Sequence, residues 1–164
     1  MLIFFGAQFF LLMEYVLHRF LFHGEHSWMQ YVPHNRYFYL IHFSIHGIHH
    51  AFPQDRFRLV MPPLLGYLYI MILFKWTLFE LFVPAELMPA WMVGFITGYL
   101  FYDLTHYFLH HSNPPDGSYF KMMKLYHMQH HYKNGEEGFG ITNKFWDRLF
   151  DTEITNDYSA QVKK

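Results

Sequence analysis

Residues 88–111 read MPAWMVGFITGYLFYDLTHYFLHH, an apolar run that ends in a cluster of histidines. The part from Met88 to about Leu109 reaches the roughly 20 residues that a helix needs to cross the ~30 Å hydrocarbon layer of a bilayer. His106 and His110 are four residues apart, so a helix places both imidazoles on one face. This segment predicts a membrane-spanning helix with paired imidazoles near its C-terminal end.

Two further apolar runs have a similar length, one from Met1 to about Phe22 and one from Leu59 to Val83. The first differs from a secretory signal, because it lacks a basic start and a small-residue cleavage site. Prolines in the connector 84–89 (PAELMP) end the second and third runs, which predicts a tight transmembrane hairpin. We therefore expect one membrane domain over residues 1–164, with spans at about 1–22, 59–83 and 88–109.

The composition favours the same class of protein. Hydrophobic residues make up 52% of the 164 residues, and charged residues only 15%. Soluble domains average about 25% charged residues, so the chain has too little charge to cover a water-facing surface. The net charge of -1 provides no basic field for nucleic acid. The absence of cysteine excludes disulfides, thiolate metal sites and cysteine nucleophiles.

The cationic residues predict the orientation in the membrane. Apart from Lys75, every Lys and Arg lies at Arg19, in the connector 23–58 or after residue 110. The positive-inside bias places these parts in the cytosol. The 14 histidines follow the same partition, and three spans would bring them to one membrane face. The predicted fold is all-α, an integral membrane helical bundle with about three transmembrane helices and a cytosolic, histidine-rich helical cap.

The histidines occur at spacings typical of metal ligands. The chain carries one H-x4-H pair, two H-x2-H-H patterns and one H-x3-H-H pattern, at 18–23, 46–50, 127–131 and 106–111. Histidines three or four residues apart share a helix face. His18 and His23 are five apart, about 140° around an α-helix, so they need a helix end or a bend to converge. A metal holds clustered imidazoles neutral, and their number exceeds what one ion can bind. Two ions are therefore expected.

The identity of the metal follows from chemistry more than from affinity. All-imidazole sites suit zinc, copper, nickel and iron alike. The chain contains no H-E-x-x-H motif, and imidazoles beside acyl chains fit oxygen activation and C–H oxidation better than hydrolysis. We expect two iron ions in the active protein with O2 as co-substrate. Zinc competes well for imidazole and can occupy the site in a purified sample.

Two acidic residues inside the apolar runs are candidates for orienting the metal ligands. Asp103 lies three residues before His106, on the same helical face, and Glu14 lies four residues before His18. Ligating histidines generally donate their free N–H to a carboxylate or a carbonyl. We expect this role for Asp103. For Glu14, this role and a water-facing position at the membrane interface both fit the sequence.

Four segments resemble the fatty acid hydroxylase superfamily of membrane di-metal oxygenases, which also contains sterol desaturases and carotenoid hydroxylases. The histidine boxes point to the superfamily as a whole. The sequences RLVMPP (58–63) and GFGITNKFWD (138–147) are similar to one branch, the fatty acid 2-hydroxylases that act on sphingolipid acyl chains. The segments are EYVLHRFLFH (14–23), HGIHHAFPQDRFRLVMPP (46–63), YDLTHYFLHH (102–111) and KLYHMQHHYKNGEEGFGITNKFWDRLFDT (124–152).

The resemblance implies a set of ten metal ligands and two further catalytic residues. Tyr102 and Asp103 match the family's pair beside the metal centre. Four histidines fall outside the ligand set: His111 is a candidate substrate contact or additional ligand, His42 is a helix-face neighbour of His46, and His26 and His34 are expected to face solvent. The ten implied ligands are His18, His23, His46, His49, His50, His106, His110, His127, His130 and His131.

The resemblance also implies an activity. A family member of this branch would be a membrane mono-oxygenase that hydroxylates carbon 2 of a long-chain fatty acyl group, free or in a sphingolipid or ceramide. Its partners would be the acyl lipid substrate, membrane lipid and a separate electron donor of cytochrome or ferredoxin type. A separate donor is implied because many relatives carry an N-terminal haem-bearing cytochrome domain that these residues lack. Relatives also tend to have another span ahead of Met1.

The same resemblance implies a multi-pass protein with its active site on the cytosolic face, in the endoplasmic reticulum of a eukaryote or the inner membrane of a bacterium. Two alternatives remain open. One is a sterol or carotenoid hydroxylase or desaturase of the same superfamily. The other, of a different class, is a histidine-rich membrane metal transporter, which would place histidines deep in mid-span.

Overall fold

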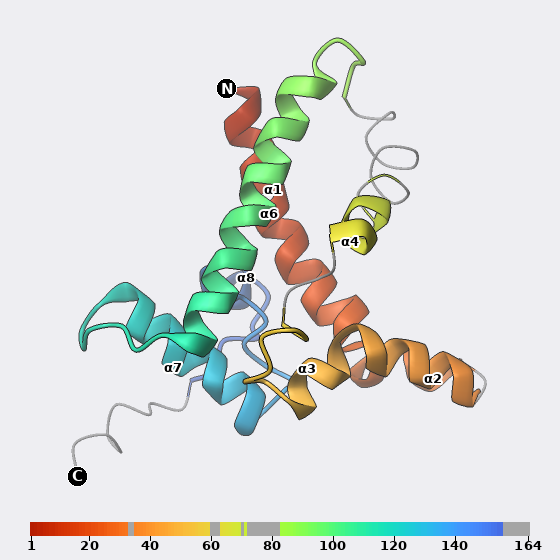
Figure 1. Ribbon diagram of the computed structural model, residues 1–164, viewed down its shortest axis with the longest axis vertical. Helices are drawn as coiled ribbons and strands as arrows, with labels where there is room; N and C mark the ends of the chain where they lie inside the picture. Colours follow the sequence, from red (N-terminus) through yellow and green to blue (C-terminus); the bar gives the residue numbers. More distant parts are fainter. Residues whose placement is uncertain (33–34, 60–62, 70, 72–82, 156–164) are drawn as a thin grey trace.

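The computed structural model describes residues 1–32, 35–59, 63–69, 71 and 83–155. Every regular element in these ranges is helical, which confirms the all-α prediction. Two long helices, α1 (Leu2–Val16) and α6 (Met88–His111), lie side by side and form a stalk (Figure 1). Shorter helices gather at the end of the stalk that lies farthest from the N-terminus, and they form a histidine-rich cap.

The first predicted span forms one continuous helical segment. α1 runs directly into a π-helical turn, η1 (Leu17–Phe22). The combined helix Leu2–Phe22 is the only one in the described ranges with both the length and the hydropathy to cross a membrane. α6 begins at the predicted residue and extends two residues beyond the predicted end, but its C-terminal half carries Asp103 and several histidines, which lower its hydropathy. Most of the predicted span 59–83 lies outside the described residues, and α4 (Pro63–Tyr69) is the helix described there.

The stalk helices approach each other at glycines. A Cβ atom at Gly94 would collide with the backbone of Ile3, and one at Gly6 would collide with the carbonyl oxygen of Trp91. Small residues of this kind let two helix backbones come into direct contact, as is common between helices in membranes. Aromatic side chains fill the remaining space: the rings of Phe10 and Phe95 lie 5.1 Å apart, edge to face.

The first half of the cap follows η1 along the chain. The short helices η2 (Gly24–His26) and η3 (Met29–Tyr31) come first. The side chain of Asn35 then accepts hydrogen bonds from the first amides of the next helix and so fixes where that helix begins. This helix is nearly continuous through three labelled parts: α2 (Arg36–His42), the π-helical turn η4 (Phe43–Gly47) and α3 (Ile48–Ala51).

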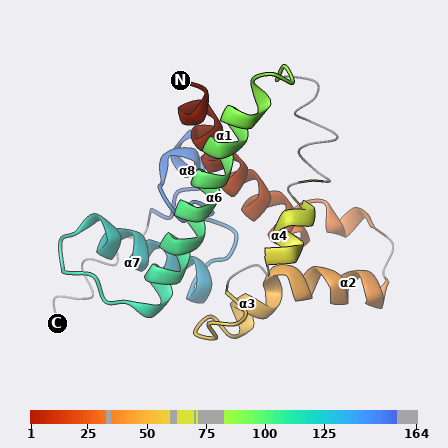
Figure 2. The same cartoon turned by 45° about the horizontal axis from the view of Figure 1, so that its top comes forward.

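The second half of the cap follows α6. The hydroxyl of Ser118 accepts a hydrogen bond from the Lys121 amide and caps α7 (Tyr119–Tyr132). The loop after α7 leads to α8 (Phe145–Leu149). A second buried core, including Leu109, Met123 and Ile141, joins α6, α7 and this loop. The C-terminal end of α7 lies beside α3 in both views of the ribbon, which brings the two halves of the cap together (Figures 1 and 2).

Replacing Gly94 by Val should separate the stalk helices, because the new side chain would occupy the position of the Ile3 backbone. Overpacking of this kind costs about 1–3 kcal/mol, and each kcal/mol corresponds to about 2–4 °C in Tm for a chain of this size. We expect the Tm of the detergent-solubilised protein to fall by about 2–12 °C. Thr97→Val, which places the same side chain on an exposed position of α6, is the matched control. Equal Tm values for the two variants would contradict close backbone packing at Gly94.

Candidate metal centre

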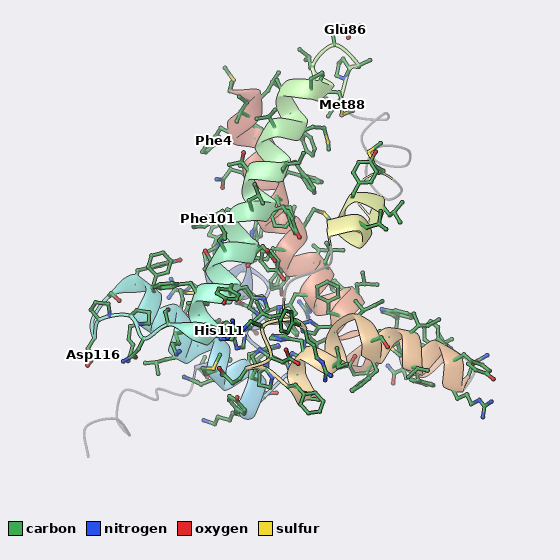
Figure 3. The ribbon with its side chains drawn as sticks, in the orientation of Figure 1. Phe4, Glu86, Met88, Phe101, His111 and Asp116 are labelled. Carbon is green, nitrogen blue, oxygen red and sulfur yellow. The ribbon has the colours of Figure 1, made fainter. Side chains whose placement is uncertain are left out.

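The cap brings together all ten of the histidines named as candidate ligands. They come from η1 and the residue after it, from η4 and α3, from the C-terminal half of α6 and from α7. Figure 3 shows nitrogen-bearing side chains crowded where these elements meet, below the stalk. Their ligand atoms form two groups, and within each group all of these atoms lie within 4.8 Å of one another.

The first group, which we call site A, joins the N-terminal half of the cap to α7. The Nε2 atom of His46 lies 3.1 Å from Nε2 of His18 and 3.0 Å from Nε2 of His50. On the other side of the group, Nε2 of His130 lies 3.1 Å from Nε2 of His23. Site A consists of His18, His23, His46, His50 and His130.

The second group, site B, joins α6 and α7 to α3. The Nε2 atoms of His106, His110 and His127 are mutually close, with separations of 2.9 to 3.2 Å. Nε2 of His131 lies 3.0 Å from Nε2 of His127. Site B consists of His49, His106, His110, His127 and His131.

A π-helical turn aligns the two ligands that an α-helix would separate. The amide of His23 donates to the carbonyl oxygen of His18 at 3.0 Å, which is an i→i+5 hydrogen bond. Such single π turns inside α-helices are frequent at functional sites. The bend expected between these two residues therefore takes the form of a wider helical turn, which places both imidazoles in site A.

Adjacent histidines in the sequence belong to different sites. His49 belongs to site B and His50 to site A, while His130 belongs to site A and His131 to site B. The ring centroids of His50 and His131 lie 4.2 Å apart, so the two sites are directly adjacent. The sequence predicts two ions. In the structure, each pair of adjacent histidines contributes one imidazole to site A and the other to site B.

The donor geometry of site B fits a metal ion better than it fits hydrogen bonds among the rings. A neutral imidazole carries a single N–H, so three mutually close Nε2 atoms cannot all be paired with one another. Nε2 of His49 is buried and has no hydrogen-bond partner among the residues described. Ligands bound tetrahedrally at the usual zinc–nitrogen distance of about 2.0–2.1 Å are about 3.3 Å apart, close to the separations in this site.

Burial keeps His49 and His50 in the form that binds metals. Desolvation lowers the pKa of His49 to about 4. Desolvation, together with the neighbouring His130 and His23, lowers the pKa of His50 to about 2. These side chains are therefore neutral near pH 7, and the neutral imidazole is the metal ligand.

Backbone carbonyls orient two candidate ligands of site A. Nδ1 of His18 donates to the carbonyl oxygen of Phe139 at 2.6 Å. Nδ1 of His130 donates to the carbonyl oxygen of Glu137 at 2.7 Å. No sequence pattern predicts these acceptors, because any residue type supplies a carbonyl. The glycines around Phe139 in NGEEGFG (134–140), which are typical of a turn, are the one local signal.

The two acidic candidates have different positions. Glu14 is buried and accepts hydrogen bonds from the backbone of the loop after α7, so a water-facing position for Glu14 is wrong. Asp103 is half-buried one turn before His106, and within the described ranges it forms no hydrogen bond with an imidazole. The ring of Tyr102 lies nearly parallel to that of His106, with centroids 5.8 Å apart. The catalytic role of Tyr102 and Asp103 stays a prediction.

Two further histidines lie outside both sites. His42 bonds through Nε2 to the carbonyl oxygen of Leu21 at 2.9 Å. His111 is exposed, at the end of α6, and its ring contacts the ring of Tyr107 (Figure 3). The predicted solvent exposure of His26 and His34 concerns two side chains that the structure does not describe.

Comparisons with known proteins agree with this geometry. The family model for fatty acid hydroxylase matches residues 2–152. The chain is 46% identical to a ceramide very long chain fatty acid hydroxylase of Schizosaccharomyces pombe, over 87% of this chain and 39% of that protein. It is 39% identical to a dihydroceramide fatty acyl 2-hydroxylase of Arabidopsis thaliana, over 90% of this chain and 58% of that protein. It is also 39% identical to a fatty acid 2-hydroxylase of Mus musculus, over 96% of this chain and 41% of that protein.

A solved structure of full-length scs7p, in which only the hydroxylase domain is visible, has the same fold. Its TM-score is 0.83 at 40% sequence identity, over 93% of this chain and 55% of that one. The chain spans about two fifths to three fifths of the length of the curated relatives above. These findings confirm the resemblance carried by the histidine boxes and by GFGITNKFWD: the chain belongs to the fatty acid hydroxylase family.

Proposed function

We propose that this chain is the hydroxylase region of a membrane mono-oxygenase that hydroxylates carbon 2 of a long-chain fatty acyl group, free or within a ceramide. The observation that carries the proposal is the pair of adjacent five-histidine sites at one end of an apolar stalk. The names of the relatives, which include ceramide and fatty acyl 2-hydroxylases, support the substrate class.

The donor set supports oxygen chemistry. Sites A and B offer imidazole alone, without a thiolate, and imidazole suits iron as well as zinc. When bound, two iron ions supply the activation of O2 and the oxidation of a C–H bond. The reducing electrons come from a separate donor protein of cytochrome or ferredoxin type.

The chain's own residues prepare the site for this chemistry. The imidazoles would hold the ions, and burial keeps His49 and His50 neutral. The buried ring of Phe139 packs against the rings of His18 and His130. Tyr102 lies beside His106 on the stalk side of site B, and Asp103 is its neighbour. We assign these two residues to the part of the site that meets the substrate.

The stalk is the membrane part of the proposal. Phe4 and Phe101 extend away from the contact between α1 and α6 (Figure 3), and Leu104 on α6 is 68% exposed. Such outward apolar side chains suit a lipid environment. We infer a single domain over residues 1–164 with three transmembrane helices at about 1–22, 59–83 and 88–109. The cap then lies on the cytosolic face of the endoplasmic reticulum or of a bacterial inner membrane.

The position of the histidines argues against the transporter alternative. A transport path requires ligands at several depths along the spans. The ligand atoms of both sites lie instead in the cap, at the end of the stalk, and α6 contributes only its C-terminal histidines. A sterol or carotenoid oxidase remains the nearest rival, and the reaction product distinguishes the two.

Single ligand replacements should each remove one ion. His130→Ala takes a ligand from site A, and His110→Ala takes a ligand from site B. We expect the metal content, measured by inductively coupled plasma mass spectrometry, to fall from about two ions per chain toward about one in each variant, since loss of a ligand weakens binding strongly. His111→Ala, an exposed histidine on the same helix as His110, should keep both ions. Full metal content in His110→Ala and His130→Ala would refute the ligand assignment.

The substrate class is tested by the product. Expression of the chain in a host without 2-hydroxylase activity, with O2 and a reductase system supplied, should yield 2-hydroxy acyl lipids detectable by mass spectrometry. His127→Ala should abolish them, because His127 is fully buried within site B. A new sterol or carotenoid product, or no hydroxylated lipid from metal-loaded protein, would contradict acyl 2-hydroxylation.

A further inference from the structure

We propose that Glu14 and Asp147 are positioning residues for site A: through the loop 137–142 they fix the orientation and the tautomer of the ligands His18 and His130. This inference rests on the proposed function only in requiring that site A holds a metal ion. It concerns neither the lipid nor the electron donor.

The loop determines which nitrogen of each ligand is free to bind. The carbonyl oxygens of Phe139 and Glu137 can only accept, so Nδ1 of His18 and Nδ1 of His130 must each carry the proton in their hydrogen bonds to the loop. Nε2 of each neutral ring then has a free lone pair, and it points into site A. If the loop were displaced, both hydrogen bonds would be lost, and neither the orientation nor the tautomer of the two rings would be fixed.

Asp147 holds the loop from the side of α8. Its Oδ1 accepts the amide of Phe139 at 2.9 Å, and its Oδ2 accepts the amide of Gly140 at 2.8 Å. The hydroxyl of Thr152 also donates to Oδ1, at 2.9 Å. Asp147 is fully buried. The carbonyl of Phe139, which orients His18, belongs to the same peptide unit as the amide of Gly140, and Asp147 accepts a hydrogen bond from that amide.

Glu14 holds the same loop from the side of α1. Its Oε1 accepts the amides of Ile141 and Thr142 at 2.7 and 2.8 Å, and its Oε2 accepts the Thr142 hydroxyl at 2.6 Å. Glu14 lies one helical turn before His18 on the same continuous helix. One helix therefore supplies both a ligand and the anchor of the loop that orients this ligand.

Together the two carboxylates accept four consecutive backbone amides, those of residues 139–142. Within the described part of the chain neither carboxylate forms an ion pair. Burying two carboxyl groups without a cation is costly, even when they are well hydrogen-bonded. The loop packs directly against one of them, because a Cβ atom at Gly140 would lie 2.7 Å from Oδ2 of Asp147. An ordinary surface turn needs no buried carboxyl group, whereas a loop that holds two metal ligands in place has a use for both.

Site B provides an internal reference. Among the described residues none of its imidazoles bonds to the loop 137–142. Disturbing the loop should therefore affect metal binding at site A and leave site B unchanged. A purely structural role for Glu14 and Asp147 would weaken both sites, because general loosening of the cap reaches all of its helices.

The test is the rate of zinc release from the purified, zinc-loaded protein to a chromogenic chelator, with His130→Ala and His110→Ala identifying the phases of site A and site B. Asp147→Asn keeps the size of the side chain but can accept only through one oxygen. It should accelerate the site A phase by about 10–100-fold and leave the site B phase within about twofold. Glu153→Gln, in the same segment but paired with Arg148 at the surface, is the matched control and should leave both phases unchanged.

A gentler pair of variants covers the case in which Asp147→Asn does not fold. Thr142→Val removes one hydrogen bond to Glu14 at nearly constant volume, and Thr142→Ser retains that bond. Release from site A should be faster in the first and normal in the second. Equal acceleration of both phases, or no change in either, would overturn the proposal, as would unaltered protein that binds no metal. Two bound ions without any 2-hydroxy product would refute the proposed function and leave this inference standing.

Discussion

The cap depends on one constraint: ten imidazoles are packed at distances where they cannot satisfy one another. Nine of the ten Nε2 atoms lie about 3 Å from the Nε2 atom of another ring in the same site, and burial lowers the pKa of His49 to about 4 and that of His50 to about 2. Under the proposed function, two ions at the centres of these groups would give every Nε2 a partner and would join elements from opposite ends of the sequence. Metal binding would then be coupled to the packing of η1, α3, α6 and α7 in the cap.

Irregular backbone segments place the histidines in the two sites. The π-helical turn η1 brings His18 and His23 to one face, and a second π-helical turn, η4, carries His46 into the same site. The consecutive histidines of α3 belong to different sites, and so do those of α7, so each of these helices contributes to both sites. The loop 137–142 adds carbonyl acceptors, and two buried carboxylates hold it in place.

The sequence predicts much of this, because histidine spacing on a helix is a strong signal. The ten histidines of the two sites and the helical class follow from periodicity and from the resemblance, and α6 begins where expected. The division of His49 from His50 depends on how α3 packs against α7, which spacing alone does not contain. Carbonyl acceptors have no residue identity, so Glu137 and Phe139 carry no pattern. The sequence does not determine the surroundings of Glu14, because its hydrogen-bond partners Ile141 and Thr142 lie more than 120 residues away along the chain.

The central claim is that two ions lie side by side, one in each histidine group, and it is tested most directly by anomalous X-ray diffraction from metal-loaded crystals at the absorption edge of the metal. The account predicts two peaks per chain, one surrounded by His18, His46 and His130 and the other by His106, His110 and His127, each at about 2.0–2.2 Å from the Nε2 atoms. A single peak, or peaks outside these two groups, would contradict it.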